Sequence, residues 1–282
     1  MNSVCVITDS TAQFPKPNFN GQQLVNVIPL EININNTKVL QYSDYKASHL
    51  PKTANLKENP ELLAPSVERL RKVFINLSQS YETIFGIFLS GDLNDCFQNA
   101  LEAAEAVRGK TDIQIIDSKT TSVGLGILVQ RLVEAVLRGD NATQIDRQIR
   151  SMIPHTYTLF CTPSLSYLHH NGFIDYSQTM ISEMLGILPI FTLEDGRITP
   201  IEKVRSRRHA LNYFQEFLEE FVSIYHIAFI QSAKPNFKDA KIFHENAKTS
   251  FPDTGFTKHI INLPLSILFG PRSNGLIVCE YF

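Results

Sequence analysis

Apolar runs alternate with helical periodicities along the first half of the chain. Branched and aromatic residues, which suit buried strands, are concentrated in VITDST (6–11), LVNVIPLEINI (24–34), TIFGIFL (83–89) and DIQIID (112–117). Apolar residues recur at helix spacing in 67–77, 97–107 and 122–137. Gly109 and Gly139 are expected to end the last two helices, and Ser122 to cap the third. The alternation predicts a doubly wound, largely parallel α/β domain over residues 1–150.

The second half has a different pattern. Asp195 and Gly196 stand between two strand-like runs, a strong signal for a hairpin turn. A helical stripe from Ala210 to Phe221 follows, and then the strand-like runs IYHIAFIQ (224–231), HIINLP (259–264) and GLIVCEYF (275–282). These elements predict a smaller mixed α/β domain over residues 151–282.

Composition narrows the class of protein. The chain has 282 residues, 43% of them apolar, which is enough to fill two cores. A formal charge of −2 gives no general attraction to nucleic acid or to membranes. The four cysteines are far apart, and no apolar run approaches the roughly 18 residues that span a bilayer. We expect a soluble, cytoplasmic protein with at most transient membrane contact.

Polar residues follow three of the predicted strands. Asp9 and Ser10 end the first, Ser90 and Gly91 follow the run 83–89, and Asp117 with Ser118 end the run 112–117. The carboxyl ends of parallel strands share one edge, where helix N-termini offer N–H groups to anions. The sequence therefore favours an anionic head group at this edge. The alternative is that these residues only form turns and helix caps.

A basic cluster precedes the long helix of the second half. Arg205, Arg207 and Arg208 fall in or just before its first turn, where the helix dipole disfavours cations. Arginine suits bidentate contact with phosphate or carboxylate, so a phosphorylated ligand or an acidic partner is one explanation. A solvated cluster without a partner is the other.

Other catalytic signals are weak. His169 and His170 are adjacent and have no metal-like spacing to a Cys or an acid, so we expect no metal. Cys96 lies near a predicted helix N-terminus, but a small buried side chain is the simpler role. The chain has no GxSxG, P-loop or GxGxxG motif. Hydrolase, nucleotide kinase and dehydrogenase functions therefore lack their usual signatures.

Seven segments in order resemble the DegV family of bacterial fatty-acid-binding proteins. They cover nearly the whole chain: VITDSTAQFP (6–15), KTANL (52–56), LSGDLNDCFQNA (89–100), IIDSKTTSVGLGILV (115–129), TPSLSYLHHNGFI (162–174), ILPIFTLEDGRITPIEKVRSRRHAL (187–211) and FGPRSNGLIV (269–278). The resemblance implies two α/β domains and an acyl chain in an apolar tunnel of the second. It also implies a carboxylate held at their junction by a Thr and a Ser, which some members present to a fatty acid kinase subunit.

The resemblance carries over to particular residues. Thr53 matches the threonine of a TSQPS-like segment, and Ser90 matches the first serine of an SSGLSG-like segment. Gly91 replaces the second serine and can offer only its N–H. Ser10 and Ser118 would furnish a polar rim, while Asp9 would brace loops.

The chain departs from the family at two usually polar positions, now Phe173 and Leu268. Arg272 could partly compensate, and Arg205 and Arg207 stand where partner-facing arginines occur in the family. The sequence thus predicts a non-enzymatic carrier of a long-chain fatty acid with weak or no activity beside a family kinase. The alternatives are a Rossmann-like enzyme for a small phosphorylated substrate, with Arg205 and Arg207 as phosphate clamps, and a scaffold that binds nothing.

Overall fold

The computed structural model describes residues 4–34, 37–39, 45–54, 60–107, 109 and 111–281. The chain divides into two compact units, Met1–Glu31 with Leu62–Pro154, and Ile32–Glu61 with His155–Phe282. The expected division was at residue 150, with all earlier residues in the first domain. The segment Ile32–Glu61 instead belongs to the second unit, which therefore holds more residues than the first.

The first unit is built on a four-stranded parallel sheet. Its strands are β1 (Val4–Asp9), β2 (Val25–Ile28), β6 (Thr83–Phe88) and β7 (Asp112–Asp117), in the order β2-β1-β6-β7. β6 is buried along its whole length, as its unbroken apolar run predicts. The run 24–34 was expected to form one strand but is divided at Pro29 into β2 and β3 (Glu31–Ile34). Proline has no N–H for a strand ladder, which explains the break.

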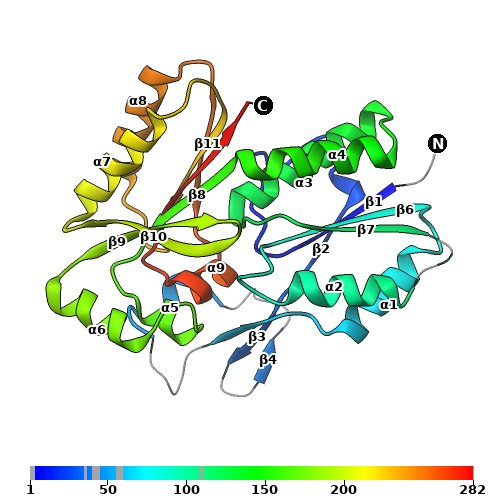
Figure 1. Cartoon of the computed structure of the whole chain (residues 1–282), viewed down its shortest axis with the longest axis horizontal. Helices are drawn as coiled ribbons and strands as arrows, with labels where there is room; N and C mark the ends of the chain where they lie inside the picture. Colours follow the sequence, from blue (N-terminus) through cyan, green and yellow to red (C-terminus); the bar gives the residue numbers. More distant parts are fainter. Residues whose placement is uncertain are drawn as a thin grey trace. The chain divides into compact units, whose positions relative to one another are not determined.

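Helices cover both faces of this sheet, as predicted (Figure 1). α1 (Val67–Leu77) and α2 (Cys96–Glu105) lie on one face, and α3 (Ser122–Arg138) and α4 (Ala142–Met152) on the other. Gly139 ends α3 with a φ of 86°, but α2 ends at Glu105, before Gly109. Ser122 is not the cap of α3. Thr121 occupies that position, and the Ser122 hydroxyl donates to Gln13 Oε1 instead.

The second unit contains a mixed six-stranded sheet in the order β10-β9-β8-β13-β11-β12. The strands are β8 (Thr156–Cys161), β9 (Leu188–Glu194), β10 (Arg197–Val204), β11 (Ile224–Gln231), β12 (Gly255–Ile260) and β13 (Asn274–Glu280). Asp195 (φ 49°) and Gly196 (φ 88°) form the two-residue turn between β9 and β10. Positive φ at both positions is what such a hairpin turn requires, so the predicted hairpin is confirmed.

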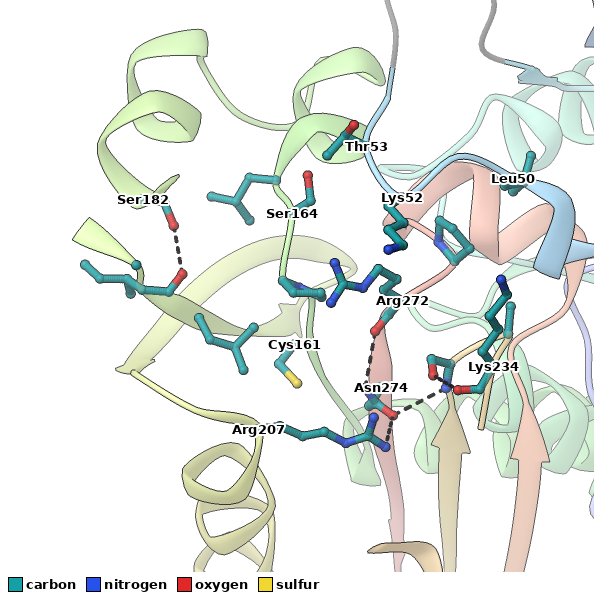
Figure 2. Close-up of a pocket in the computed structure, with 18 of the residues that line it drawn as sticks. Leu50, Lys52, Thr53, Cys161, Ser164, Ser182, Arg207, Lys234, Arg272 and Asn274 are labelled. Atoms are coloured by element: carbon teal, nitrogen blue, oxygen red, sulfur yellow. Dashed lines mark hydrogen bonds between the residues drawn. The ribbon is translucent and has the colours of Figure 1, made fainter. Parts of the chain in front are cut away.

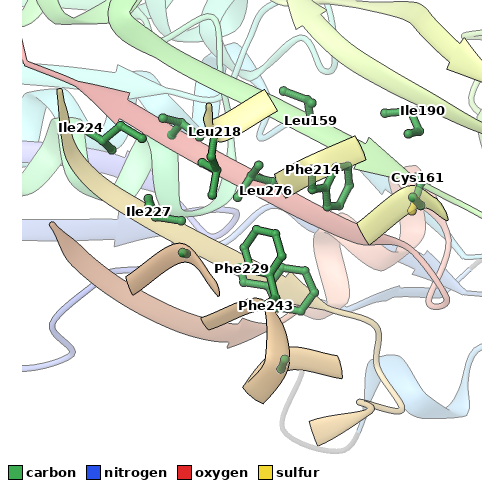
Figure 3. Packing of buried hydrophobic residues seen from close by; sticks show 14 residues of the cluster. Leu159, Cys161, Ile190, Phe214, Leu218, Ile224, Ile227, Phe229, Phe243 and Leu276 are labelled. Atoms are coloured by element: carbon green, nitrogen blue, oxygen red, sulfur yellow. The ribbon is translucent and has the colours of Figure 1, made fainter. Parts of the chain in front are cut away.

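The α-helices in the described part of the second unit are α5 (Ser166–His170), α6 (Tyr176–Leu185), α7 (Arg207–Leu218), α8 (Phe237–Ser250) and α9 (Leu263–Phe269). Phe214 and Leu218 of α7 and Phe243 of α8 pack with Phe229 of β11 in one core (Figure 3). The run 259–264 is only partly a strand. Asn262 caps α9 by accepting from the N–H of Leu265, and Pro264 suits a first helical turn.

The remaining elements are short. β3 forms a three-stranded sheet with β4 (Thr37–Val39) and β5 (Glu61–Leu63), in the order β4-β3-β5. Turns of 3₁₀ helix occupy Gln22–Leu24, Ala47–His49 and Ile153–His155. Among the described residues, no helix combines the length and apolar character needed to cross a bilayer. The predicted α/β class, with one parallel and one mixed sheet, is confirmed.

Candidate functional site

The polar strand ends of the first unit meet at the carboxyl edge of its sheet. Asp9 Oδ2 accepts from the Leu89 N–H at 2.7 Å, while Oδ1 accepts from the N–H and hydroxyl of Thr11 at 2.8 and 2.6 Å. The carboxyl is completely buried, and this burial raises its pKa, although the same hydrogen bonds act in the opposite direction. Asp9 therefore braces the loops that follow β1 and β6.

The three candidate serines of this unit all make hydrogen bonds to the backbone. Ser10 Oγ accepts from the Leu30 N–H at 3.0 Å, Ser90 Oγ from the Asp92 N–H at 3.2 Å, and Ser118 Oγ donates to the Thr120 carbonyl at 3.2 Å. Ser90 and Ser118 are fully buried. The contacts of Ser90 and Ser118, each to a residue two positions along the chain, are those of the turn-forming alternative, whereas Ser10 joins two distant segments.

The Gly91 N–H is directed at a carboxylate of the protein itself. It lies 3.3 Å from both oxygens of Asp117, which also accepts from the Lys119 N–H and forms an ion pair with Lys119 Nζ at 2.9 Å. A ligand carboxylate would have to replace Asp117 to reach this donor. Cys96 is buried below the same loop, and its pKa is raised well above the usual value by burial and by Asp9, so it is a thiol.

The second unit contains a cavity of about 800 Å³ at the end of its sheet (Figure 2). β8 and β11 end there, β13 begins there, and α6 and the segment 48–53 complete the wall. The lining residues are Ser48, Leu50, Lys52, Thr53, Cys161, Pro163, Ser164, Leu165, Ser182, Gly186, Ile187, Leu188, Arg205, Arg207, Ser232, Ala233, Lys234, Pro271, Arg272 and Asn274. The volume lies in the range of small-molecule sites, roughly 300–1,000 Å³.

Five cations line this cavity: Lys52, Arg205, Arg207, Lys234 and Arg272. No Asp or Glu stands among the lining residues that the structure describes. Arg207 Nε lies 2.8 Å from Asp239 Oδ2, outside the cavity, whereas the other four cations form no salt bridge within the described ranges. An anion entering the cavity would meet an excess of positive charge.

Apolar side chains form another part of the wall. Leu50, Leu165, Ile187 and Leu188 line it, and Ser182 Oγ donates to the Ile187 carbonyl at 3.2 Å, which joins α6 to the start of β9. A cavity with cations on some surfaces and branched aliphatic residues on others suits a molecule with an anionic head and an apolar tail.

Hydrogen bonds within the second unit hold the segment that carries Thr53. The Ala54 N–H donates to Ser166 Oγ at 2.7 Å, Ser166 Oγ lies 2.8 Å from Ser164 Oγ, and the Tyr167 hydroxyl donates to the Pro51 carbonyl at 2.8 Å. Thr53 itself is exposed. Asn55 and Leu56 of the same motif lie outside the described residues.

The structure thus brings together four residues singled out from the sequence, Thr53, Arg205, Arg207 and Arg272. The other candidates belong to the first unit instead: Ser10, Ser90, Gly91 and Ser118. The sequence did not single out Lys234, Asn274 or Lys52, although Lys52 directly precedes Thr53. Arg207 begins α7 as predicted, after the Ser206 cap, whose hydroxyl accepts from the His209 N–H.

Nucleophilic or metal chemistry finds little support in the described parts of the chain. Burial raises the pKa of Cys161 to about 12, although the nearby Arg207 lowers it, so this lining cysteine is a thiol. His169 Nδ1 lies 3.1 Å from the Ile174 carbonyl. Within the described residues, no three His, Cys, Asp or Glu side chains are grouped as a metal site would require.

The two departures from the family pattern, Phe173 and Leu268, do not line this cavity. Leu268 is buried in α9, all seven residues of which are buried, and Phe173 is half-buried after α5. Neither is among the lining residues.

A family model for DegV proteins, described as uncharacterised, matches residues 3–280. The chain belongs to the DegV family. DegV domain-containing protein SAR1438 of Staphylococcus aureus is 25% identical over 285 residues, covering 99% of this chain and 100% of the relative. Protein DegV of Bacillus subtilis is 25% identical over 224 residues, covering 78% of this chain and 79% of its own. The resemblance seen in the sequence is confirmed.

Solved structures of DegV proteins share the fold over the full length. The fatty acid binding DegV family protein SAG1342 from Streptococcus agalactiae superposes with a TM-score of 0.84 at 22% identity, covering 100% of both chains. The Streptococcus pneumoniae fatty acid kinase (Fak) B3 protein, loaded with linoleic acid, gives 0.84 at 16% identity, covering 99% of this chain and 100% of its own. At these identities the likeness shows the common fold.

Proposed function

We propose that this DegV protein is a non-enzymatic carrier that binds a long-chain fatty acid in the cavity of its second unit. The carboxylate would face Thr53 and the lining arginines and lysines, and the acyl chain would lie against Leu165, Ile187 and Leu188. Charge-assisted hydrogen bonds would hold the head. Burial of the tail contributes roughly 0.8 kcal/mol per methylene before the costs of association.

One observation carries this proposal: in the described part of the chain, the cavity joins five cations, with no lining acid, to a branched aliphatic wall. Relatives of the same fold support it, since the SAG1342 protein is described as fatty acid binding and a Eubacterium eligens DegV protein was solved with heptadecanoic acid. The rival, an enzyme for a small phosphorylated substrate, needs no aliphatic wall. At the first unit's sheet edge, Asp9 and Asp117 already occupy the loop N–H groups that a phosphate would use.

The decisive experiment is native mass spectrometry of the purified protein, followed by lipid extraction and measurement of oleate binding. We expect one fatty acid per chain. Ile187→Asp, which places a carboxylate in the aliphatic wall, should weaken oleate binding by at least about tenfold. Ile201→Asp, on exposed β10 outside the cavity, should change it by less than about twofold. Binding of inorganic phosphate without any binding of oleate would favour the enzyme instead.

We further propose that the contact with membranes is transient and uses α6. Met184, Leu185, Tyr176 and Ile181 of this helix are exposed, Met184 to 80%, and Ser182 of the same helix lines the cavity. Exposed apolar side chains beside lining cations suit an anionic bilayer surface. The double variant Met184→Glu, Leu185→Glu should lose flotation with phosphatidylglycerol vesicles. Val222→Glu, at a 97% exposed position elsewhere, should keep it. Equal flotation of both variants would contradict the use of α6.

A fatty acid kinase is the partner that the family resemblance implies, and we propose that this chain supports such a kinase weakly. Phe173 and Leu268 replace polar groups of the family pattern, and loss of one group that stabilises developing charge can cost about a hundredfold in rate. Reconstitution with a family kinase subunit, ATP and oleate tests this. Acyl phosphate formed as fast as with an unmodified family member would contradict it.

A further inference from the structure

The side chain of Asn274 connects three parts of the cavity wall in the second unit. Its Oδ1 accepts from Arg207 Nη2 and from the Ser232 N–H, each at 3.3 Å, and its Nδ2 donates to the Arg272 carbonyl at 3.3 Å (Figure 2). Asn274 is 6% exposed and begins β13. The start of α7, the end of β11 and the loop before β13 are therefore held by one amide.

Arg207 is anchored from two sides. Asp239 of α8 lies 2.8 Å from its Nε, and Asn274 accepts from its Nη2. The ion pair with Asp239 holds the guanidinium near α8, although Nε itself makes no hydrogen bond there, so the directed contact is the one from Nη2 to Asn274. Further N–H groups of the arginine remain for a ligand. The other lining cations have no such pair of anchors among the described residues, so a ligand would have to order them on binding.

We propose that Asn274 is a positioning residue that fixes the Arg207 guanidinium for the anionic head group of the ligand. The inference rests on the proposed fatty acid binding. Preorganisation is the physical reason, because an arginine that is already ordered in the empty protein loses little rotamer freedom when the carboxylate arrives. Asn274 would act through Arg207, without touching the ligand.

The hydrogen-bond chemistry at position 274 calls for an amide. Two donors, Arg207 and the Ser232 N–H, need an acceptor there, and the Arg272 carbonyl needs a donor. Aspartate would supply the acceptors, but its second carboxylate oxygen would repel the Arg272 carbonyl oxygen. Its negative charge would also neutralise Arg207. Alanine would release Arg207 without adding charge.

The test compares oleate with oleyl alcohol, which has the same tail and no charge, in a double-mutant cycle of Asn274→Ala and Arg207→Ala. We expect Asn274→Ala to weaken oleate binding roughly five- to tenfold and to leave oleyl alcohol within about twofold. In the Arg207→Ala background it should cause no further loss. Asn274→Asp should weaken oleate more than Asn274→Ala. Asn212→Ala, at an exposed position of α7 outside this cavity, is the matched control.

Several results would overturn the inference. Equal losses for both ligands would show a packing role, and the same oleate loss in the Arg207→Ala background would show direct contact between Asn274 and the ligand. Thermal unfolding of each variant shows whether a loss of binding comes from a loss of folding. If Asn274→Ala does not fold, Asn274→Ser takes its place. Absence of oleate binding in the wild-type protein would overturn the proposed function as well. Unchanged oleate binding in Asn274→Ala, with a wild-type protein that binds, would overturn only this inference.

Discussion

Burial decides what each polar side chain near a strand end or cavity can do. Asp9 and Ser90 are fully buried and hold loops of the first unit. Thr53 is exposed and lines the cavity of the second unit. The three residues look alike in the sequence, as polar groups next to loops, but only an accessible hydroxyl can meet a ligand without breaking existing hydrogen bonds.

Thr53→Val should lower oleate affinity roughly three- to tenfold, because the head group loses one hydrogen bond to a charged acceptor. Stability should change little, since the residue is exposed. Titration calorimetry with oleate measures the effect. Thr249→Val, at an exposed position of α8, serves as control, and equal affinities for the two variants would remove Thr53 from the site.

Ser90→Val should instead destabilise the first unit by about 1–3 kcal/mol. The valine would leave the Asp92 N–H without its acceptor and would add volume at the fully buried position of Ser90. Urea unfolding measures this loss. A fully stable Ser90→Val protein would show that the Ser90 hydroxyl is dispensable for the loop.

Asp9→Asn should lower the free energy of unfolding by about 1–3 kcal/mol at pH 7. The NH₂ group of the asparagine would point at an N–H group of Leu89 or Thr11, which would then lose its acceptor. Burial raises the pKa of Asp9 above 3.8, so the folded state binds its proton more tightly than the unfolded chain. The free energy of unfolding of the wild-type protein therefore increases as the pH falls through the folded-state pKa of Asp9, and it decreases again as the pH rises.

The difference between wild type and Asp9→Asn should accordingly grow as the pH is lowered from 7 toward 4. Urea unfolding at several pH values measures it. Asp253→Asn, at an exposed position, should stay within about 0.5 kcal/mol of wild type throughout. A difference that shrinks on acidification would contradict the direction of the Asp9 pKa shift.

At the scale of elements, tertiary contacts can reverse what helix propensity favours. Gly126 lies inside α3, where alanine would ordinarily stabilise the helix by about 1 kcal/mol. A Cβ at this position would overlap the Gln13 carbonyl oxygen and come within 2.7 Å of the carbonyl carbon. The segment after β1 thus packs backbone against helix, and the glycine permits that approach.

Gly126→Ala should therefore destabilise the protein by about 1–3 kcal/mol in spite of its better helix propensity. Thermal or urea unfolding measures the change. Leu137→Ala, at a solvent-exposed position of the same helix, should cost less than about 0.5 kcal/mol. Stabilisation by Gly126→Ala would mean that propensity outweighs the contact with Gln13.

For the molecule as a whole, the small net charge does not reflect the local excess of positive charge in the cavity. The chain carries a formal charge of −2, yet five cations and no lining acid meet in one cavity of the described structure. Screening acts on such exposed groups because the Debye length is about 10 Å at 0.1 M salt. Ligand recognition should therefore depend on ionic strength although the protein is nearly neutral.

Oleate affinity should fall severalfold between about 50 and 500 mM salt, while affinity for oleyl alcohol should not fall. Fluorescence competition at constant pH measures both ligands. The double variant Arg205→Gln, Arg272→Gln should show a weaker salt dependence for oleate, since both side chains line the cavity and are exposed. Parallel salt curves for acid and alcohol would contradict an electrostatic head-group site.

Local signals in the sequence determined most of the elements. The pattern of apolar residues predicted the strands of the first sheet and the helices α1, α2 and α3, but not α4, and Asp195-Gly196 predicted the hairpin. These features depend on a few neighbouring residues and on propensities that act within one element. Failures arose at boundaries where several local signals compete, as at Ser122 and in the run 259–264, which Asn262 and Pro264 turn into a helix.

Only the tertiary structure decided the candidate site. It joined Lys52, Arg205, Lys234 and Arg272 from separate loops in one cavity, and it committed the Gly91 N–H to Asp117. Neither result is local: a cavity depends on which side chains converge from distant segments, and the availability of a donor depends on what already faces it. The sequence supplied the family and the candidate residues, while packing determined which of them line a cavity.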